Sequence, residues 1–456
     1  MIDVAWASGA EIAAGVRRGE IASADVVDAT LARIAARNGI LNAFTTVTGQ
    51  RAKARAAGGL SGSLAGVPFA VKNLFDIAGV PTVAGSKINR GHAPPTADAT
   101  LIARMEAAGA VLVGALNMGE YAYDFTGENL HDGPSRNPHD TSRMTGGSSG
   151  GSGGAVAGGL VPIALGSDTN GSIRVPSSFC GVFGLKPTFG RLSRGGSFPF
   201  VASLDHLGPF ARTVTDLALA YDTMTGPDEL DPACTDRVDA PVLPVLEQGI
   251  GGLRLARAGG YFREGATAEV LTAFDEAAAA IEAVREIELP EVVRARAAAY
   301  VITTSEGAAL HLQRLRTRAR EFDPDVRDRL IAGAMVPAPW VVQAQKFRRW
   351  FRGAVLKVFE EVDAIIAPST PFTAPPLGQK TFVLNGREVP LRPNIGIYTQ
   401  PISFVGLPVV AVPVPGGSGL PVGLQIITAP WREDVALRIA AEMERRGIVR
   451  APRPPE

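Results

Sequence analysis

The sequence contains few of the residues that mark several common protein classes. Its 456 residues include only two cysteines, Cys180 and Cys234, and two thiols do not make a disulfide framework. We therefore expect reduced core thiols in a cytosolic protein. Lysine plus arginine and aspartate plus glutamate both number 45, so the formal net charge is zero. This lack of a basic excess argues against direct nucleic-acid binding.

Signals for export and for membrane insertion are also missing. The N-terminal segment, MIDVAWASGAEIAAGVRRGE, lacks the charged-then-apolar layout of a signal peptide. Two long uncharged runs, residues 144–167 and 393–431, are interrupted by Gly, Ser and Pro. Neither run supplies the ~20 predominantly apolar residues that a spanning helix needs. We therefore expect a cytoplasmic protein without membrane contact.

The patterns that mark metal and phosphate sites are weak or absent. There is no HExxH and no CxxC. The two histidines of HDGPSRNPHD, His131 and His139, are separated by Pro and Gly, as is usual in surface loops. The Gly-rich run of the chain has neither a G-K-[ST] ending nor a GxGxxG frame. The sequence therefore predicts no metal and no cofactor.

What the sequence does contain is one stretch, residues 145–188, that is rich in Gly and Ser yet lies within apolar sequence. A first loop carries Ser148, the apolar run 160–165 predicts a buried strand, and a second loop carries Ser172. Glycine permits close backbone approaches that a Cβ would forbid. We interpret the stretch as a helix and a strand between two serine-bearing loops that take part in catalysis. A flexible linker is disfavoured, because apolar helix and strand signals lie so close to it.

Alternating strand and helix signals between residues 67 and 220 favour an α/β sheet. Before this region, residues 10–57 show helical periodicity, with Ser23 as the expected N-cap of one helix and Gly39 and Asn42 at its end. Residues 117–139 read as a polar loop with exposed aromatic side chains, Tyr121, Tyr123 and Phe125. Further strands and two further helical regions are predicted from local periodicity: strands at 67–71, 110–116 and 362–367, a strand pair carried by 401–413 and 420–429, and helices within 98–108 and 266–344.

Lys72 stands at the end of the predicted strand VPFAV, in a chain with only seven lysines. A lysine at a buried strand end loses hydration, which lowers its pKa, and a neutral amine can act as a general base. The alternative is a strand-end lysine that reaches solvent or pairs with Asp76. The residues alone slightly favour this second interpretation.

Ser148 and Ser172 need a base, because a hydroxyl is a poor nucleophile until its proton is removed. No SxxK spacing occurs at any lysine. Two windows, 146–150 and 150–154, match the G-x-S-x-G nucleophile elbow, but such matches arise by chance in a Gly/Ser-rich run. The elbow also demands a later Asp and then a His, and only His206 and His311 follow, neither in a clear catalytic loop. A Ser-His-Asp triad is thus disfavoured but stays open.

Four segments taken together resemble the amidase signature family. GGSSGGSGGAVAGG followed by GSDTNGSIRVPSSFCGVFGLKPT resembles its signature block, AGVPFAVKNLFD its lysine block, LNMGEYAYDFTGEN the intervening segment, and GLPVGLQIITAPWRED a C-terminal block. The resemblance implies one large α/β domain over residues 1–456, with a central mixed β-sheet covered by helices on both faces. It also implies three regions: a catalytic core at about 60–220, a helical variable region at about 230–350, and a C-terminal return to the sheet at about 355–445.

The same resemblance implies a Ser–Ser–Lys triad, which overturns the strand-end interpretation of Lys72. Ser172 matches the nucleophile that carries an acyl-enzyme, Ser148 matches the bridging serine after a cis peptide bond, and Lys72 matches the base. The backbone of the loop would form the oxyanion hole, through Thr169, Asn170, Gly171 and Ser172. Many members of the family have Gly at the position of Asn170. The Asn170 side chain would therefore narrow the pocket near the oxyanion hole, and its amide offers a contact to substrate.

Within the family, TNGSIRVPSS, NPHDTSRMTGGSSGGSG and TQPISFVGLPVV resemble a branch that hydrolyses 1-carboxybiuret. This implies release of ammonia from a small, anionic, urea-like amide, and a small helical partner subunit within an oligomer. Candidate substrate-binding residues are Asn170, Tyr123 and Arg174, and the Arg-rich segment 314–320 offers a carboxylate fork or is a solvated helix face. Two alternatives remain: the A subunit of a glutamyl-tRNA(Gln) amidotransferase, and a non-catalytic scaffold, against which the intact triad residues argue.

Overall fold

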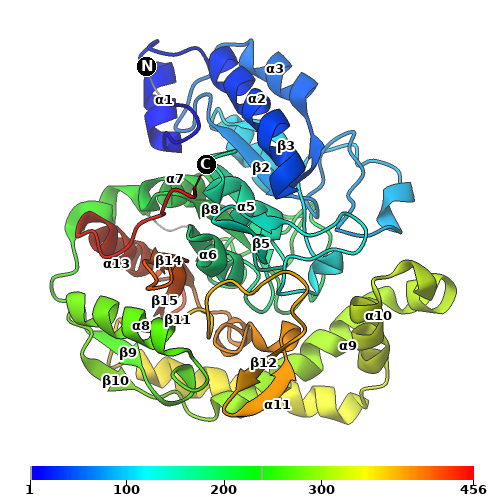
Figure 1. Cartoon of the computed structure of the whole chain (residues 1–456), viewed down its shortest axis with the longest axis vertical. Helices are drawn as coiled ribbons and strands as arrows, with labels where there is room; N and C mark the ends of the chain where they lie inside the picture. Colours follow the sequence, from blue (N-terminus) through cyan, green and yellow to red (C-terminus); the bar gives the residue numbers. More distant parts are fainter. Residues whose placement is uncertain (1–2, 238–239, 456) are drawn as a thin grey trace.

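A mixed sheet of eleven strands runs through the centre of the computed structural model, which describes residues 3–237 and 240–455 (Figure 1). The hydrogen-bonded order is β1-β3-β2-β6-β8-β7-β14-β15-β11-β9-β10. In chain order these strands are β1 (Phe44–Val47), β2 (Pro68–Lys72), β3 (Val111–Leu116), β6 (Ile163–Asp168), β7 (Phe183–Lys186), β8 (His206–Ala211), β9 (Leu255–Ala258), β10 (Arg285–Ile287), β11 (Ala364–Pro368), β14 (Val409–Val414) and β15 (Val422–Thr428).

The pairing directions place the strands that matter for function side by side. Strand β2 is parallel to both of its neighbours, β3 and β6, while β6 is antiparallel to β8. The carboxyl ends of β2 and β6 therefore lie at the same edge of the sheet. Two small hairpins lie outside it: β4 (Arg136–Asn137) with β5 (Asp140–Met144), and β12 (Thr381–Leu384) with β13 (Arg387–Pro390).

Helices flank this sheet, with α1–α3 at one end of the molecule and α9–α11 at the other (Figure 1). The α-helices are α1 (Gly9–Arg17), α2 (Ser23–Leu41), α3 (Gly49–Ala56), α4 (Thr100–Ala107), α5 (Gly150–Ala157), α6 (Arg174–Cys180), α7 (Val214–Met224), α8 (Ala268–Ala280), α9 (Val292–Arg318), α10 (Pro324–Ala334), α11 (Ala338–Val358), α12 (Gln400–Phe404) and α13 (Glu433–Arg445). Short 3-10 helices are η1 (Asn89–Gly91), η2 (Glu120–Ala122), η3 (Leu243–Gln248), η4 (Gly260–Phe262), η5 (Ala319–Glu321) and η6 (Arg392–Asn394).

The central strands are buried along their whole length, including β2, β3, β6, β8, β14 and β15. Strands covered on both faces read as continuous apolar runs, because no face meets water. The prediction of one large α/β domain, with a mixed sheet flanked by helices, is confirmed. The division into three regions stays a prediction. None of the helices in the described ranges is long and apolar enough to cross a membrane.

Some local expectations were wrong. Ser23 is the first residue of α2 rather than its N-cap, and its hydroxyl donates to the Ala56 carbonyl oxygen at 2.9 Å. Of the two residues expected to end this helix, Gly39 lies inside α2, and Asn42 follows it in the left-handed conformation with φ of 48°. The strand pair expected within 401–413 and 420–429 is present as β14 and β15; β14 takes up only the second part of its segment, because Gly406, with φ of 71°, turns the chain between α12 and β14.

Another error concerns the aromatic side chains of residues 121–125, which we expected to be exposed. Tyr121, Tyr123 and Phe125 are all buried. Segments distant in the chain cover them. The centre of the Tyr121 ring lies 4.1 Å from the centre of the His311 ring of α9, and the centre of the Tyr123 ring lies 4.8 Å from that of Phe200. A polar loop sequence does not reveal such cover.

Candidate active site

Lys72 is fully buried at the carboxyl end of β2. Its Nζ atom lies 2.7 Å from the Ser148 Oγ atom and 2.8 Å from the Ser167 Oγ atom. Burial lowers the pKa of Lys72 to about 7, against the opposing charges of Asp205, Asp168 and Asp124. The strand-end interpretation is therefore wrong, since the amine does not reach solvent and Asp76 instead accepts a hydrogen bond from the Thr82 hydroxyl at 2.5 Å.

Ser148 lies in the turn before α5, where the peptide bond from Gly147 to Ser148 is cis. This turn is held from both sides by backbone hydrogen bonds. The Gly147 N–H donates to the Phe125 carbonyl oxygen at 2.9 Å, and the Gly119 N–H donates to the Ser148 carbonyl oxygen at 3.1 Å. The turn also packs on helix α6, because a Cβ added at Gly146 would lie 3.0 Å from Val175 Cγ1. The two serine-bearing loops are therefore neighbours.

The loop with Ser172 is fixed at both ends by one buried ion pair. Asp168 ends β6 and Arg174 begins α6, and the guanidinium donates from Nε and Nη2 to the two carboxylate oxygens at 3.0 Å each. Burial opposes ionisation of Asp168, but the Arg174 charge outweighs it and holds the pKa of the carboxyl below its ordinary value. Gly171 has φ of 141°, and a Cβ there would collide with the Thr399 hydroxyl.

The backbone N–H groups of this loop are available to a ligand. Across the described parts of the chain, the N–H groups of Asn170, Gly171 and Ser172 donate to no protein acceptor. Such unpaired donors beside a nucleophile are the requirement for an oxyanion hole. In the same ranges, no hydrogen bond joins the hydroxyls of Ser148 and Ser172. The structure thus places Lys72 against Ser148 directly, and Ser172 in the adjoining loop.

Ser172 lines a small cavity of about 20 Å³. A cavity needs roughly 10–15 Å³ to hold one water, so a substrate must displace lining side chains on entry. Two buried polar atoms of the lining, the Asn170 Oδ1 and the Tyr123 hydroxyl, have no hydrogen-bond partner among the described residues. The remaining lining residues are Ala122, Asp124, Phe125, Thr169, Phe200, Tyr300, Thr303, Arg329 and Gln400.

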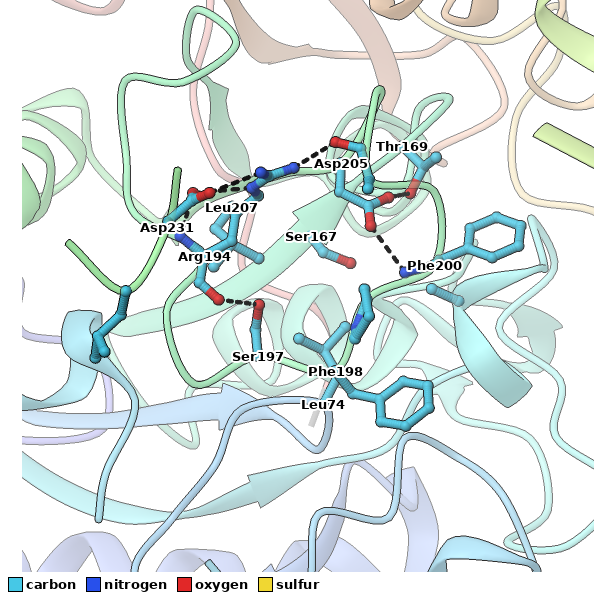
Figure 2. Close-up of a pocket in the computed structure, with 14 residues that line it drawn as sticks. Leu74, Ser167, Thr169, Arg194, Ser197, Phe198, Phe200, Asp205, Leu207 and Asp231 are labelled. Carbon is cyan, nitrogen blue, oxygen red and sulfur yellow. Dashed lines mark hydrogen bonds and ion pairs between the residues drawn. The ribbon is translucent and has the colours of Figure 1, made fainter. Parts of the chain in front are cut away.

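A second cavity of about 160 Å³ lies behind this one and shares Ala122, Thr169 and Phe200 with it. Ser167, the second partner of Lys72, lines it (Figure 2). Figure 2 shows Asp205 on the wall of this cavity, where its carboxylate accepts from the Thr169 hydroxyl at 2.6 Å and from the Phe200 N–H at 2.8 Å. Asp205 therefore holds Thr169, which lies in the wall between the two cavities.

Several residues considered from the sequence have other partners. Arg174 does not line the cavity of Ser172; besides Asp168, it donates to the Gln425 Oε1 atom at 2.7 Å. His206 Nδ1 faces the Leu204 carbonyl oxygen at 2.6 Å, and His311 Nδ1 faces the Arg314 guanidinium at 3.3 Å. The Nε2 atom of each ring is buried without a partner among the described residues, so neither histidine contacts a serine hydroxyl there. A Ser-His-Asp triad therefore has no support here.

The histidines considered for metal binding are bonded within the protein. His131 Nε2 lies 3.0 Å from Glu120 Oε1, and His139 Nε2 lies 3.0 Å from the Cys180 carbonyl oxygen. Within residues 3–237 and 240–455, no three His, Cys, Asp or Glu side chains are grouped so that they could hold a metal ion.

Sequence reasoning missed four residues of the site: Ser167, Thr303, Arg329 and Gln400. Ser167 had a usable signal, because it directly follows the buried strand pattern and precedes Asp168 at the edge where Lys72 was expected. The other three residues come from α9, α10 and α12. The periodicity of a segment predicts that it is a helix, but not which distant loop that helix contacts.

Comparison with known proteins identifies the family of the chain. A model of the family described as Amidase matches residues 25–437. The chain belongs to the amidase signature family. Among curated proteins it is 53% identical to AtzE, the 1-carboxybiuret hydrolase subunit of Pseudomonas sp. (strain ADP), over 96% of this chain and 98% of that protein. It is 38% identical to the A subunit of the glutamyl-tRNA(Gln) amidotransferase of Roseiflexus sp. (strain RS-1), over 94% of each chain.

Two solved structures have the same fold. One, described as an unexpected vestigial protein complex that reveals the evolutionary origins of an s-triazine catabolic enzyme, superposes with a TM-score of 0.96 at 52% identity, over 98% of this chain and 100% of that one. The other, the A subunit of the glutamyl-tRNA(Gln) amidotransferase of Thermotoga maritima, gives a TM-score of 0.84 at 31% identity, over 98% and 96% of the two chains. This amidase signature protein is therefore a hydrolase acting on carbon–nitrogen amide bonds.

Proposed function

We propose that this amidase signature hydrolase releases ammonia from a small, carboxylated, urea-like amide such as 1-carboxybiuret, through a Ser–Ser–Lys triad. The contact that carries the proposal is the buried Lys72 amine 2.7 Å from the Ser148 hydroxyl oxygen, with Ser172 in the adjoining loop. The substrate class is supported by the 53% identity to a protein named as belonging to a 1-carboxybiuret hydrolase.

Acylation would begin with proton transfer. Neutral Lys72 accepts the proton of Ser148, and Ser148 accepts that of Ser172 once substrate has closed the gap between the two hydroxyls. Ser172 Oγ then attacks the amide carbonyl carbon, and a tetrahedral oxyanion forms. The N–H groups of Asn170, Gly171 and Ser172, which have no acceptor among the described residues, would donate to that oxygen. One such donor is typically worth ~2.7–4 kcal/mol of transition-state stabilisation.

Collapse of the oxyanion would break the carbon–nitrogen bond. The proton held by the relay passes from Ser148 to the departing nitrogen, so that ammonia leaves as a neutral molecule and Lys72 returns to its neutral form. A water then attacks the acyl group on Ser172 with the same relay as base. Hydrolysis regenerates the Ser172 hydroxyl and releases the acid product.

The alternative, the A subunit of an amidotransferase, has weaker support. The relatives with that name are 36–38% identical to this chain, against 53% for the hydrolase relative. A non-catalytic scaffold does not account for a buried lysine held between two serine hydroxyls. Because a similar solved structure is described as a protein complex, we also propose that the chain works in the cytoplasm with a small helical partner subunit, in an oligomer.

An ammonia-release screen tests the proposal. The purified chain is assayed with 1-carboxybiuret, biuret, allophanate, malonamate and glutamine, and the Ser172→Ala variant serves as the blank. We expect ammonia from 1-carboxybiuret above all, with a transient acyl adduct on Ser172 visible by intact-protein mass spectrometry. Ammonia from glutamine alone would favour the amidotransferase, and no ammonia from any amide, with the small helical partner present or absent, would favour the scaffold.

A further inference from the structure

Among the residues that the structure describes, one cation of the Ser172 cavity has no anionic partner. Arg329, on α10, lines the cavity, and its Cζ atom lies 3.9 Å from the centre of the Tyr123 ring. Its Nε donates to the Asp325 carbonyl oxygen at 2.7 Å, and its Nη2 donates to the Tyr123 carbonyl oxygen at 2.5 Å. In the described ranges no carboxylate lies within 4.0 Å of this guanidinium. Backbone carbonyls orient the charge of Arg329 but do not neutralise it.

The Tyr123 hydroxyl beside this cation is also unpartnered. The hydroxyl is buried, lines the cavity and has no hydrogen-bond partner within the described parts of the chain. Buried polar atoms in native proteins are nearly always hydrogen-bonded, so an unpaired hydroxyl in a binding cavity indicates a ligand acceptor.

Gln400 adds a third donor to the same wall. Its Oε1 accepts from the Arg296 Nε at 3.0 Å, and an arginine can only donate, so the amide oxygen faces Arg296. The Nε2 group is therefore the donor end of the Gln400 amide that faces away from Arg296, near the Tyr300 hydroxyl in the same cavity lining. The wall thus consists of a cation, a hydroxyl and an amide N–H, all suited to an anion.

The loop of Ser172 presents the opposite chemistry. The Asn170 Nδ2 donates to the Thr303 hydroxyl oxygen at 3.0 Å, so the Oδ1 end of the amide is turned away from Thr303. The Asn170 Oδ1 is buried in the cavity lining, without a partner among the described residues. An unpaired carbonyl oxygen beside the nucleophile is an acceptor for an N–H group of the substrate.

From these contacts we infer that the cavity binds a short amide with an anionic end, held between two specificity-determining groups. Arg329, with the Tyr123 hydroxyl and the Gln400 amide, binds the carboxylate; Asn170 Oδ1 accepts a substrate N–H next to the scissile bond. The inference rests on the proposed function and assigns the carboxylate contact that it requires. Because Ser172 and Arg329 line the same small cavity, the amide and the carboxylate of the substrate must lie close together.

This assignment replaces the segment 314–320 that the sequence offered as a carboxylate fork. The Arg314 guanidinium lies 5.3 Å from the centre of the Phe198 ring, and Arg318 pairs with Glu321 at 2.7 Å. Neither residue lines the cavity of Ser172.

The test uses two amides of nearly equal shape, malonamate with its carboxylate and malonamide, which has a neutral carboxamide in its place. We expect the wild-type enzyme to prefer malonamate. The Arg329→Gln variant should lose on the order of 10–100-fold in kcat/KM for malonamate, mostly through KM, because a hydrogen bond to a charged group is lost. Its kcat/KM for malonamide should change less than about threefold, and Arg329→Lys should restore part of the malonamate activity.

Arg327→Gln is the matched control, since Arg327 lies on the same helix and pairs with Asp328 at 2.8 Å. It should leave both substrates unaffected. Equal losses for malonamate and malonamide in Arg329→Gln would assign Arg329 a structural role and overturn the inference, as would a wild type that prefers malonamide.

Binding without turnover separates this inference from the proposed reaction. In calorimetry with the Ser172→Ala variant, malonamate should bind at least tenfold more tightly than malonamide, and the added Arg329→Gln change should abolish that difference. If neither amide is hydrolysed by the wild type but this binding preference is present, the proposed reaction fails and the anion site stands. Equal binding of the two amides overturns the anion site whatever the activity.

Discussion

The Lys72 amine and the Ser148 hydroxyl are hydrogen-bonded at 2.7 Å although 76 residues separate them in the chain. The relationship exists because β2 and β6 are parallel neighbours, so the end of β2 faces the turn that leads into α5. A third group completes the contact, since Ser167 at the end of β6 lies 2.8 Å from the same Nζ atom. With no carboxylate bonded to the amine within the described ranges and full burial around it, the pKa of Lys72 is lowered to about 7, so the neutral amine is substantially populated near neutral pH.

The pH dependence of the reaction follows from this burial. The pKa of Lys72 is lowered to about 7, and the neutral amine is the form that accepts a proton. We therefore expect kcat/KM to rise about tenfold per pH unit below pH ~7 and to level off above it. Initial rates between pH 5 and 9, with circular dichroism at each pH to exclude unfolding, measure this profile. Full activity at pH 5 without a basic limb would argue that Lys72 is not the base.

Removal of the Lys72 amine should abolish the rise of kcat/KM with pH, together with the activity. Lys72→Met keeps the length and apolar stem of the side chain, and we expect kcat to fall by a factor on the order of 10²–10⁴, the usual contribution of a positioned base. Lys53→Met is the matched control, because Lys53 is exposed and pairs with Asp28 at 2.8 Å. Rates of both variants at pH 8 measure the difference, and a Lys72→Met enzyme with near-normal kcat would exclude the relay.

The serines of the Gly/Ser-rich stretch should separate into two groups. Ser172→Ala and Ser148→Ala should each lower kcat by roughly 10³-fold or more, and the double variant should lose little further, because residues that act as a unit are non-additive. Ser152→Ala should keep activity within a few-fold, since its hydroxyl donates to the Leu165 carbonyl oxygen at 3.0 Å inside the fold. Steady-state rates of the four variants are the measurement. Additive losses for Ser172 and Ser148 would contradict a shared relay.

The conformation of Gly171 predicts opposite outcomes for two glycine substitutions. Gly171→Ala should lower both the activity and the unfolding midpoint, because φ of 141° disfavours a Cβ that would also collide with the Thr399 hydroxyl. Gly353→Ala, on an exposed position of α11 with no atom within 4 Å of the added Cβ, should instead stabilise the protein by about 0.5–1 kcal/mol. Urea denaturation of both variants measures the two shifts, and a Gly171→Ala protein as active and stable as the wild type would show that the loop conformation is not required.

The buried pair of Asp168 and Arg174 should matter for stability. Arg174→Met leaves a buried carboxylate without its partner, so we expect a loss of about 3–5 kcal/mol in the free energy of unfolding. The double variant Asp168→Asn, Arg174→Met should recover part of this loss, since no uncompensated charge remains. Arg18→Met, whose partner Glu20 is exposed, should leave the unfolding midpoint unchanged. A destabilisation by Arg174→Met no larger than that by Arg18→Met would contradict the assigned role.

The distribution of successes and errors along the chain has a physical pattern. The strands ending at Lys72 and Leu116 were predicted to within a residue at each end, because a fully buried strand is a continuous apolar run between turn residues. A helix after Ser23 was predicted with Gly39 and Asn42 at its end, and the observed left-handed end at Asn42 is also a local property. The expectation that Tyr121 is exposed was wrong because its cover comes from α9, about 190 residues later.

By itself, the sequence determined the α/β alternation, the two serine-bearing loops, the lysine at a strand end and the family, because these depend on local periodicity and on contiguous motifs. Only the tertiary structure decided that Lys72 is fully buried between Ser148 and Ser167, and that Arg329 rather than the 314–320 segment reaches the cavity of Ser172. The reason is that burial, and with it the pKa of an amine or the pairing of a guanidinium, is set by every segment that packs around a group. Those segments come from the whole chain, and no single segment determines the order of the strands in the sheet.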